Sequence, residues 1–310
     1  SSAEATMNAE VGVGRVLREH SGQINSLDFS HDGEFLATAG DDHRLCVYSC
    51  QHGTLNKVVN CRKHGVRHLR FTHDQRSVIV ATNQGDPGEI RYLSLHDERY
   101  LRCFKAHTKP VVALEMSPKD DLFASAALDD TARIWDLRST DCVAVMRFAS
   151  EGERPAVSFD PKGMVLAAAI GDGQTKLFDV RAYERGPFAT FTPDASTKSC
   201  SCIKFSNDGN YMLQCTAKAT VLLLDAYKGD LLQTFTGHDN SSGMPLEASF
   251  SADAEYIVAG SEDGSVWRWT RSGQAMPALK GHHGPVTAVK CSPTRRMMAS
   301  ACSVLSLWMT

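Results

Sequence analysis

The spacing of large side chains along the chain constrains its fold more than any other feature. A short β-pattern closes on a bulky residue at seven places, which are Tyr48, Leu93, Trp135, Phe178, Leu224, Trp269 and Trp308. The intervals between these residues are 45, 42, 43, 46, 45 and 39. In the clearest copy, Asp129 stands six residues before Trp135. A period in the low forties with an acidic residue ahead of an aromatic one is typical of β-propeller blades.

Each repeat also contains the strands that one blade requires. We expect an inner strand, two middle strands and an outer strand per repeat, with inner strands near residues 24–29, 66–71, 111–116, 156–159, 202–205, 246–250 and 286–291. Turns such as Ser206–Gly209 follow the inner strands, because Asp and Asn side chains bond their own backbone and Gly accepts a positive φ. The pattern predicts blades of the WD-repeat type.

The outer strand of the seventh repeat is the one that needs a separate explanation. The sequence stops at Thr310, whereas residues 14–19 lie before the first repeat and have the right length for a strand. We expect this segment to pair with the last blade, since closing the ring removes an exposed sheet edge. The predicted fold is all-β, a seven-bladed WD-repeat β-propeller closed by an N-terminal strand. Residues 1–13 are predicted to be a flexible N-terminus, and residues 14–310 a single propeller.

Composition narrows the possible functions. A net charge of −3 gives no whole-protein electrostatic argument for nucleic acid. No apolar run approaches the roughly 18 residues of a membrane-spanning helix. Residues 1–10 lack the apolar stretch of a secretory signal. We therefore expect neither direct nucleic-acid binding nor membrane association.

Ten cysteines raise the question of a disulfide framework or a metal. None forms a Cys-x-x-Cys pair, and Cys200 and Cys202 share one side of a strand without a second pair to complete a tetrahedral set. The adjacent His282 and His283 would diverge on any strand. Because free cysteine packs as a small hydrophobe, we expect reduced core thiols in an intracellular protein, with no metal and no cofactor.

Four residues of the third repeat resemble a hydrolase site when they are read together: His107, Ser125, Asp129 and Trp135. In WD repeats these residue types form a structural relay, in which His binds the turn Asp and the network reaches the strand Ser and the Trp ring nitrogen. Each bond contributes roughly 1 kcal/mol net, and stranding a buried member costs more. A catalytic triad needs an exposed nucleophile. We therefore predict a structural role and no catalytic residue.

The relay is uneven around the ring. The first repeat offers His20, Asp42 and Tyr48, and the sixth offers His238, Asp263 and Trp269. The fourth keeps Asp172 without the His, the fifth has Ala217-Lys218-Ala219 in place of an acidic turn, and the seventh shortens the turn to Cys302-Ser303-Val304. These three repeats are either weak and stabilised by their neighbours, or their surfaces are adapted to a partner. The residues do not decide between the two interpretations.

Basic residues recur on the loops that lead into the inner strands, which lie on one rim of a propeller. This candidate basic arc consists of Lys63, Lys109, Arg154 and Lys198, with Lys218 on a neighbouring turn. We hypothesise that it receives an acidic or phosphorylated segment, because a phosphoserine brings about −1.5 to −2 charges. The alternative is five solvated side chains, since an exposed charge pair is worth under about 1 kcal/mol.

Several stretches beyond the generic repeat resemble one particular family. They are residues 90–97, 111–118, 186–191, 246–250 and 299–303. They resemble the WD-repeat propeller subunit shared by the Set1-type (COMPASS) histone methyltransferase and by the protein phosphatase 1 complex on the PNUTS scaffold, or its cleavage-and-polyadenylation counterpart in fungi. The resemblance extends from about Val16 to Trp308. It diverges at residues 150–154 and at the blade-two insertion 84–88, where partner surfaces need not match.

The resemblance implies a nuclear, non-catalytic adaptor without a cofactor. Such a subunit docks a segment of a PNUTS-like scaffold with protein phosphatase 1, or of a Set1-type methyltransferase, and is a monomer within that hetero-complex. It ties the attached enzyme to RNA polymerase II, whose phosphorylated tail is a candidate ligand, and the implied outcome is transcription termination. In some lineages the phosphatase assembly also carries a chromatin or modified-DNA reader.

Two other functional classes compete with the adaptor. Trp135, Asp136 and Arg138 fit the Trp-Asp-x-Arg box through which substrate receptors of cullin-type ubiquitin ligases contact their adaptor, although this box overlaps the normal end of a WD repeat. An enzyme has little support, because the sequence contains neither a Gly-rich phosphate loop nor a nucleophile elbow. The adaptor is the function that the sequence favours.

Overall fold

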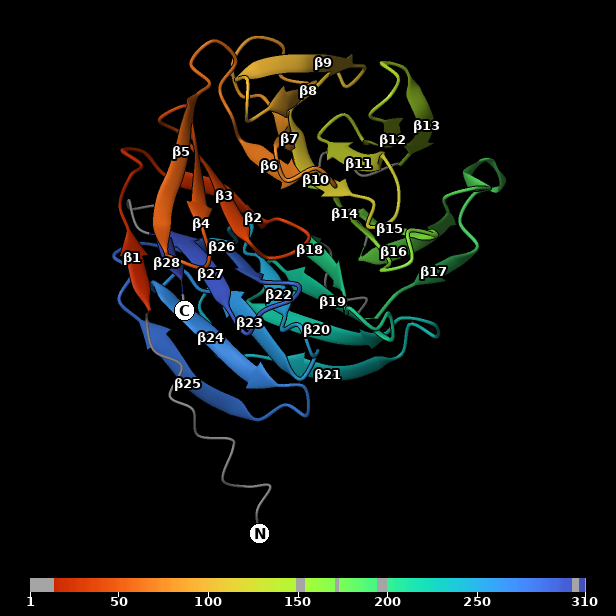
Figure 1. The fold of residues 1–310 in the computed structure, drawn as a ribbon. Helices are drawn as coiled ribbons and strands as arrows, with labels where there is room; N and C mark the ends of the chain where they lie inside the picture. Colours follow the sequence, from red (N-terminus) through yellow and green to blue (C-terminus); the bar gives the residue numbers. More distant parts are fainter. Residues whose placement is uncertain (1–13, 149–153, 171–172, 194–199, 303–306, 310) are drawn as a thin grey trace.

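The structure is a computed structural model that describes residues 14–148, 154–170, 173–193, 200–302 and 307–309. Within these residues the strands form seven antiparallel sheets of four strands each. Figure 1 shows the sheets set around a common centre, each turned edge-on to it like a blade. The prediction of an all-β propeller is confirmed. The predicted flexible N-terminus, residues 1–13, lies outside the described residues.

Six of the sheets are built from consecutive strands, ordered from the inner to the outer strand. The first three contain β2 (Ile24–Phe29), β3 (Phe35–Gly40), β4 (Arg44–Ser49) and β5 (Thr54–Asn60); β6 (His68–Phe71), β7 (Ser77–Ala81), β8 (Glu89–Ser94) and β9 (Arg99–Lys105); and β10 (Val111–Met116), β11 (Leu122–Ala127), β12 (Thr131–Asp136) and β13 (Cys142–Arg147). The next three contain β14 (Ala156–Phe159), β15 (Val165–Ile170), β16 (Gln174–Asp179) and β17 (Ala189–Phe191); β18 (Cys200–Phe205), β19 (Tyr211–Thr216), β20 (Thr220–Asp225) and β21 (Leu231–Phe235); and β22 (Ala248–Phe250), β23 (Tyr256–Gly260), β24 (Ser265–Thr270) and β25 (Ala275–Lys280). A short 3-10 helix, η2 (Tyr183–Arg185), connects β16 to β17.

The remaining sheet joins the two ends of the chain. It contains β1 (Arg15–Leu17), β28 (Leu307–Met309), β27 (Met298–Cys302) and β26 (Val286–Cys291), in that order. β1 runs antiparallel to β28, with Val16 opposite Trp308. The segment before the first repeat thus supplies the outer strand that the last repeat lacks.

Two inner strands are shorter than the sequence indicates. β6 begins at His68 rather than at residue 66, and the other is β22. We expected it over residues 246–250, but β22 begins at Ala248. The Glu247 amide donates instead to the Thr287 carbonyl of the neighbouring sheet, at 3.2 Å, and the Glu247 carbonyl accepts from Gly260. The backbone at this position therefore connects two sheets.

The core lies between neighbouring sheets. Leu45 of the first sheet packs in one cluster with Leu69 and Val78 of the second. Between the second and third sheets, the rings of Phe104 and Trp135 meet edge to face with centroids 5.7 Å apart. Because every sheet buries both faces against its neighbours, the surfaces left for function are the outer strand edges, the two rims and the centre of the ring.

Candidate functional site

The cysteine and histidine side chains raise two questions, whether they form disulfides and whether they bind a metal. All ten cysteines lie in the described part of the chain, and all are free thiols. Among the described residues, no three His, Cys, Asp or Glu side chains come close enough together to hold a metal ion. No helix in that part of the chain is long and apolar enough to cross a membrane.

The third sheet brings together the four residues that resemble a hydrolase site. His107, just before β10, places Nδ1 3.0 Å from Oδ2 of Asp129 in the turn between β11 and β12. Its Nε2 lies 2.7 Å from Oγ of Ser125 on β11, and Nε1 of Trp135 donates to the same oxygen at 2.8 Å. Thr131 Oγ1 adds a 2.7 Å bond to the Asp129 carboxylate. These bonds make one continuous chain from the rim to the inter-sheet core.

The protonation states in this relay follow from its geometry. Burial lowers the pKa of His107, although Asp129 raises it, so the imidazole is neutral near pH 7. A neutral imidazole that donates from Nδ1 to Asp129 accepts at Nε2, so the Ser125 hydroxyl donates to His107. Ser125 is 0% exposed and its oxygen also accepts from Trp135. With its proton and a lone pair engaged and no access to solvent, this hydroxyl lacks what a nucleophile requires.

The first sheet contains a shortened form of the relay. His20 Nδ1 lies 3.0 Å from Asp42 Oδ1, and its Nε2 lies 2.8 Å from Thr38 Oγ1. Tyr48, at the position of Trp135, donates its hydroxyl to Glu19 at 3.2 Å. The hydrogen bonds of His20 lower the pKa of Asp42, although burial raises it.

In the sixth sheet the predicted relay is wrong. His238 Nδ1 is buried without a hydrogen-bond partner in the described part of the chain. Asp263 instead accepts from the Ser265 amide at 2.9 Å. The reason is local: Ala259 stands ten residues before Trp269, where Ser125 stands before Trp135. Without a strand hydroxyl nothing links the His to the Trp by hydrogen bonds, and their rings meet edge to face at 5.8 Å.

The seventh repeat contains a relay pair that the sequence analysis missed. His282 Nε2 lies 2.9 Å from Ser300 Oγ. Burial, with a smaller effect of His283, lowers the pKa of His282 to about 4. The signal was present, because His282 stands four residues before Val286 of β26, as His107 stands four before Val111 of β10.

The Trp-Asp-x-Arg box has one residue in the core and another at the surface. Trp135 is 1% exposed and belongs to the relay. The Arg138 side chain is 75% exposed and its Nη2 lies 2.7 Å from Asp136 Oδ2. These hydrogen bonds from Arg138 lower the pKa of the Asp136 carboxyl. The guanidinium is accessible, but it is already held by a carboxylate of its own turn.

The members of the basic arc have different surroundings. Lys63 and Lys109 are exposed on the loops before β6 and β10, and Lys218 is exposed in the turn between β19 and β20. Lys198 lies outside the described residues. Arg154 is not a solvated rim side chain: it points toward the centre of the ring, where its Nη2 donates to the Val112 carbonyl at 2.9 Å.

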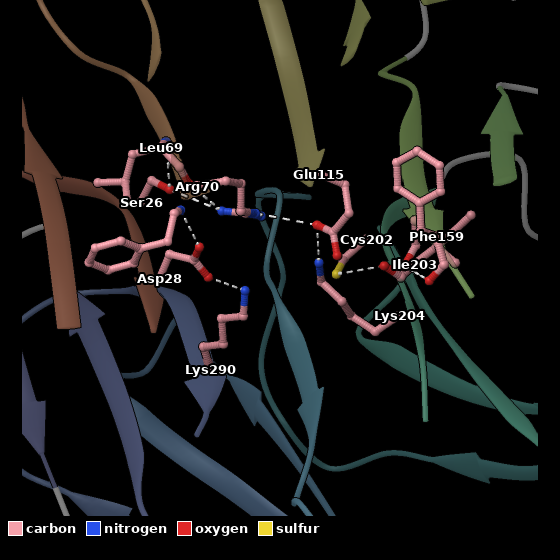
Figure 2. A network of polar contacts seen from close by, with 12 residues as sticks. Ser26, Asp28, Leu69, Arg70, Glu115, Phe159, Cys202, Ile203, Lys204 and Lys290 are labelled. Atoms are coloured by element: carbon pink, nitrogen blue, oxygen red, sulfur yellow. Dashed lines mark hydrogen bonds and ion pairs between the residues drawn. The ribbon is translucent and has the colours of Figure 1, made fainter. Parts of the chain in front are cut away.

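The centre of the ring contains a set of charges that the sequence analysis did not identify. The penultimate residues of the seven inner strands are Asp28, Arg70, Glu115, Ser158, Lys204, Ser249 and Lys290. We call the five charged ones the channel charge network. Figure 2 shows Arg70 and Lys204 converging on Glu115, with their nitrogens 3.3 and 2.7 Å from Oε2, while Lys290 contacts Asp28. Asp28 also accepts from the Phe71 amide at 2.8 Å.

This network joins sheets that are not neighbours in sequence. Lys290 and Asp28 link the last inner strand to the first, and Lys204 reaches Glu115 past the sheet that carries Ser158. The cations Lys204, Arg70 and Lys290 lower the pKa of Glu115 to about 2, against burial, which raises it. The signal in the sequence is a charged residue at the penultimate position of five of the seven inner strands.

Two cavities lie at the two ends of the inner strands. The cavity where the inner strands begin, the N-face cavity, has a volume of about 260 Å³. It is lined by residues of the inner strands or of the loops that enter them in all seven blades, among them Arg67, His68, Arg154 and Thr287. The cavity where the strands end, the C-face cavity, has a volume of about 240 Å³ and is lined by the channel charge network. Arg70 and Lys204 belong to both linings.

Comparison with known proteins places this architecture in a family. The family model "WD domain, G-beta repeat" matches residues 13–49, 98–136, 229–270 and 273–306. The chain is 41% identical over 301 residues to WD repeat-containing protein 82 of Drosophila melanogaster, which covers 96% of this chain and 93% of the relative. It is 34% identical over 218 residues to Set1 complex component swd2 of Schizosaccharomyces pombe, covering 68% of this chain and 59% of the relative. It is 27% identical over 260 residues to COMPASS component SWD2 of Saccharomyces cerevisiae, covering 81% and 77%. The chain therefore belongs to the family of WD-repeat propeller proteins that includes WD repeat-containing protein 82 and the Swd2 components.

Proposed function

We propose that this chain is a non-catalytic adaptor subunit of a nuclear Set1-type histone methyltransferase complex. The observation that carries the proposal is its relatedness to two proteins whose names describe Set1 and COMPASS components. The relay geometry agrees with a non-catalytic role, because the one Ser–His–Asp arrangement that resembles a hydrolase is buried and saturated. Residues 14–310 act in this proposal as a single seven-bladed unit, a monomer within the hetero-complex.

The finer proposal adds a second assembly. We infer that the same subunit docks a segment of a PNUTS-like scaffold that holds protein phosphatase 1, and that it ties the attached enzyme to RNA polymerase II during transcription termination. In some lineages a chromatin or modified-DNA reader joins the same assembly. The exposed Lys63 and Lys109 are the arc members best placed to meet the phosphorylated polymerase tail.

The outer strands give the scaffold segment a place to dock. Leu101 of β9, Val143 of β13 and Leu232 of β21 are 51%, 43% and 47% exposed. Each of these strands is the last of its sheet and has no neighbouring strand on one edge, although in β13 the Val143 carbonyl accepts a hydrogen bond from the Tyr183 hydroxyl at 2.7 Å. Such an edge accepts an extended peptide as an added strand, with apolar side chains beside it for further contacts.

Affinity purification from nuclear extract with mass spectrometry tests the adaptor role. We expect a methyltransferase, a phosphatase with its scaffold, or both. In the double variant Lys63→Glu/Lys109→Glu we expect the polymerase to be lost and the scaffold to be kept. Lys162→Glu, an exposed charge reversal in the turn after β14 on the opposite rim, is the matched control. Recovery of neither enzyme would remove the adaptor proposal.

The alternative, a substrate receptor of a cullin-type ubiquitin ligase, rests on the exposure of Arg138. If it holds, Arg138→Ala abolishes recovery of the ligase adaptor. If the scaffold role holds, the same variant purifies with the same methyltransferase or phosphatase partners as the wild type. The two outcomes separate the functions in one experiment.

A further inference from the structure

The N-face cavity has a positive charge that the protein does not neutralise. The linings of both cavities together contain Arg67, Arg70, Arg154, Lys204 and Lys290, against the carboxylates Asp28, Glu115 and Glu247. Arg70 and Lys204 share Glu115, and Lys290 pairs with Asp28. Two positive charges remain in excess. In the described part of the chain, neither Arg67 nor Arg154 has a carboxylate within ion-pair distance.

The wall of the same cavity contains polar atoms without partners. Within the described residues, His68 Nε2, Arg154 Nε and Thr287 Oγ1 are buried and make no hydrogen bond. His68 is 9% exposed as a whole. His68 belongs to β6, Thr287 to β26 and Arg154 to the loop before β14, and all three line the N-face cavity. Because an unsatisfied buried polar group costs about 1–3 kcal/mol, three such atoms around one space give a polar ligand three groups to bind.

The electrostatics point to the sign of that ligand. Burial, with the charges of Arg154, Arg70 and Arg67, holds the pKa of His68 well below its usual range. Burial and then the repulsion from Arg67 lower the pKa of Arg154 to about 10, so this guanidinium is still charged at neutral pH. A neutral imidazole can present an N–H at Nε2. The cavity thus combines two charged donors, a neutral donor and a hydroxyl.

We propose that the N-face cavity binds a phosphate-class dianion held by Arg67, Arg154, His68 and Thr287. Two excess positive charges match a dianion, and guanidinium groups suit phosphate oxygens because they donate in a planar fork. The cavity volume of about 260 Å³ is well above the roughly 30 Å³ that one water occupies in the liquid, so a single phosphoryl group fits. Glu247 in the same wall disfavours a larger polyanion. This site is independent of the adaptor role.

Titration calorimetry of the whole chain with inorganic phosphate, against chloride at equal ionic strength, tests the site. We expect saturable binding to the wild type and an affinity about tenfold lower in Arg67→Gln, as for loss of one charge-assisted hydrogen bond. Arg62→Gln is the matched control, because Arg62 is exposed in the same loop and does not line the cavity. Equal affinities in the two variants would mean general surface attraction and would overturn the proposal.

Two further variants keep the test independent of folding. Arg67 is exposed, so its substitution leaves the core intact, whereas Arg154→Gln removes the donor to Val112 and requires a melting curve without phosphate. Thr287→Val keeps the side-chain shape and removes the orphaned hydroxyl. We expect both to weaken phosphate binding, and wild-type affinity in a folded Arg154→Gln protein would contradict the assignment.

The source of the phosphoryl group is distinguished by a second titration. A short peptide with one phosphoserine is compared with inorganic phosphate and with the unphosphorylated peptide. Tighter binding of the phosphopeptide, lost in Arg67→Gln, identifies a phosphorylated side chain as the source. Binding of phosphate alone identifies a free anion. If neither binds the wild type, the site does not exist, whatever the outcome of the affinity purification.

Discussion

The relay of the third sheet and the N-face cavity use similar groups in opposite ways. In the relay, His107 has a partner at each ring nitrogen, and the Ser125 oxygen contacts both His107 and Trp135. In the cavity, His68 and Arg154 each have a buried nitrogen that finds no hydrogen-bond partner among the residues that the structure describes. The relay lies between packed strands, whereas the cavity opens at the centre of the ring. Saturated polar groups stabilise a fold, and unsaturated ones are available to a ligand.

This difference separates residues that only look functional from residues that can be functional. The triad-like spacing of His107, Ser125 and Asp129 suggests chemistry, but its hydrogen bonds consume every group that chemistry would need. His68 and Thr287 belong to no motif, yet their environments are incomplete. Saturation of hydrogen bonds is thus a better guide to function here than residue type.

The largest effect is expected where the channel charge network is broken. Glu115→Gln removes the one carboxylate that Arg70 and Lys204 share, and leaves two partly buried cations without a counter-charge. We expect a loss of about 2–4 kcal/mol in the free energy of unfolding, measured with urea. Glu255→Gln, which removes an exposed partner of Arg271, is the control and should change stability little. Equal losses would show that the network does not hold the sheets together.

The Glu115 carboxylate also makes the stability of the fold depend on pH. The pKa of Glu115 in the folded protein is about 2, below its ordinary value of 4.5. Its contribution is therefore complete above about pH 4.5 and is lost as the pH falls toward 2. We expect melting temperatures of the wild type to fall more steeply over this range than those of Glu115→Gln. Parallel curves would contradict the low pKa.

A smaller effect distinguishes the complete relay from the incomplete one. His107→Ala strands Ser125 and Asp129, and we expect a loss of about 2–3 kcal/mol. His238→Ala removes a ring whose Nδ1 has no partner in the described part of the chain, so we expect a smaller loss, about 1 kcal/mol. Both rings contact a tryptophan, which makes the pair well matched. Suppose that His238→Ala lowered the free energy of unfolding as much as His107→Ala. The contribution of these histidines to stability would then come mainly from packing and not from hydrogen bonds.

The smallest effect concerns the tyrosine that replaces tryptophan in the first sheet. Tyr48→Phe removes the 3.2 Å bond to Glu19 and leaves His20 bonded to Asp42 and Thr38. We expect a change under about 1 kcal/mol in unfolding free energy. A larger loss would mean that the Tyr48 hydroxyl belongs to the relay after all.

The architecture was predictable because a propeller repeats one strand pattern at nearly constant spacing. The third-sheet relay followed from the same repeat, since His107, Asp129 and Trp135 keep fixed offsets from their strands. The relay predicted for the sixth sheet was wrong because His238, Asp263 and Trp269 are not sufficient for it. The strand position between them is Ala259, which has no hydroxyl to extend the chain of hydrogen bonds. His282 was not predicted, because an adjacent His pair resembles a candidate metal site and the shortened turn of the seventh repeat hides its offset from β26.

The channel charge network at the centre of the ring could not be predicted from the sequence, for a different reason. Arg70, Glu115 and Lys204 are 45 and 89 residues apart along the chain, and only ring closure brings them within contact distance. Periodicity predicts that inner strands share a register, but the partner that each penultimate side chain reaches depends on side-chain length and on which intervening strands carry Ser. The same holds for Arg154, which belongs to a rim loop and yet turns inward.

The pairing of β1 with β28 has a consequence for how the protein is made. β1 leaves the ribosome before the six sheets that follow it in the sequence, whereas its partner strand β28 emerges after them. Every sheet between them can assemble before β1 finds its partner, so the final sheet forms only after β28 has been synthesised. Contacts of such long sequence separation form slowly. Until then the unpaired backbone of the last sheet is open to other strands, and a folding helper bound there would protect the nascent chain from association.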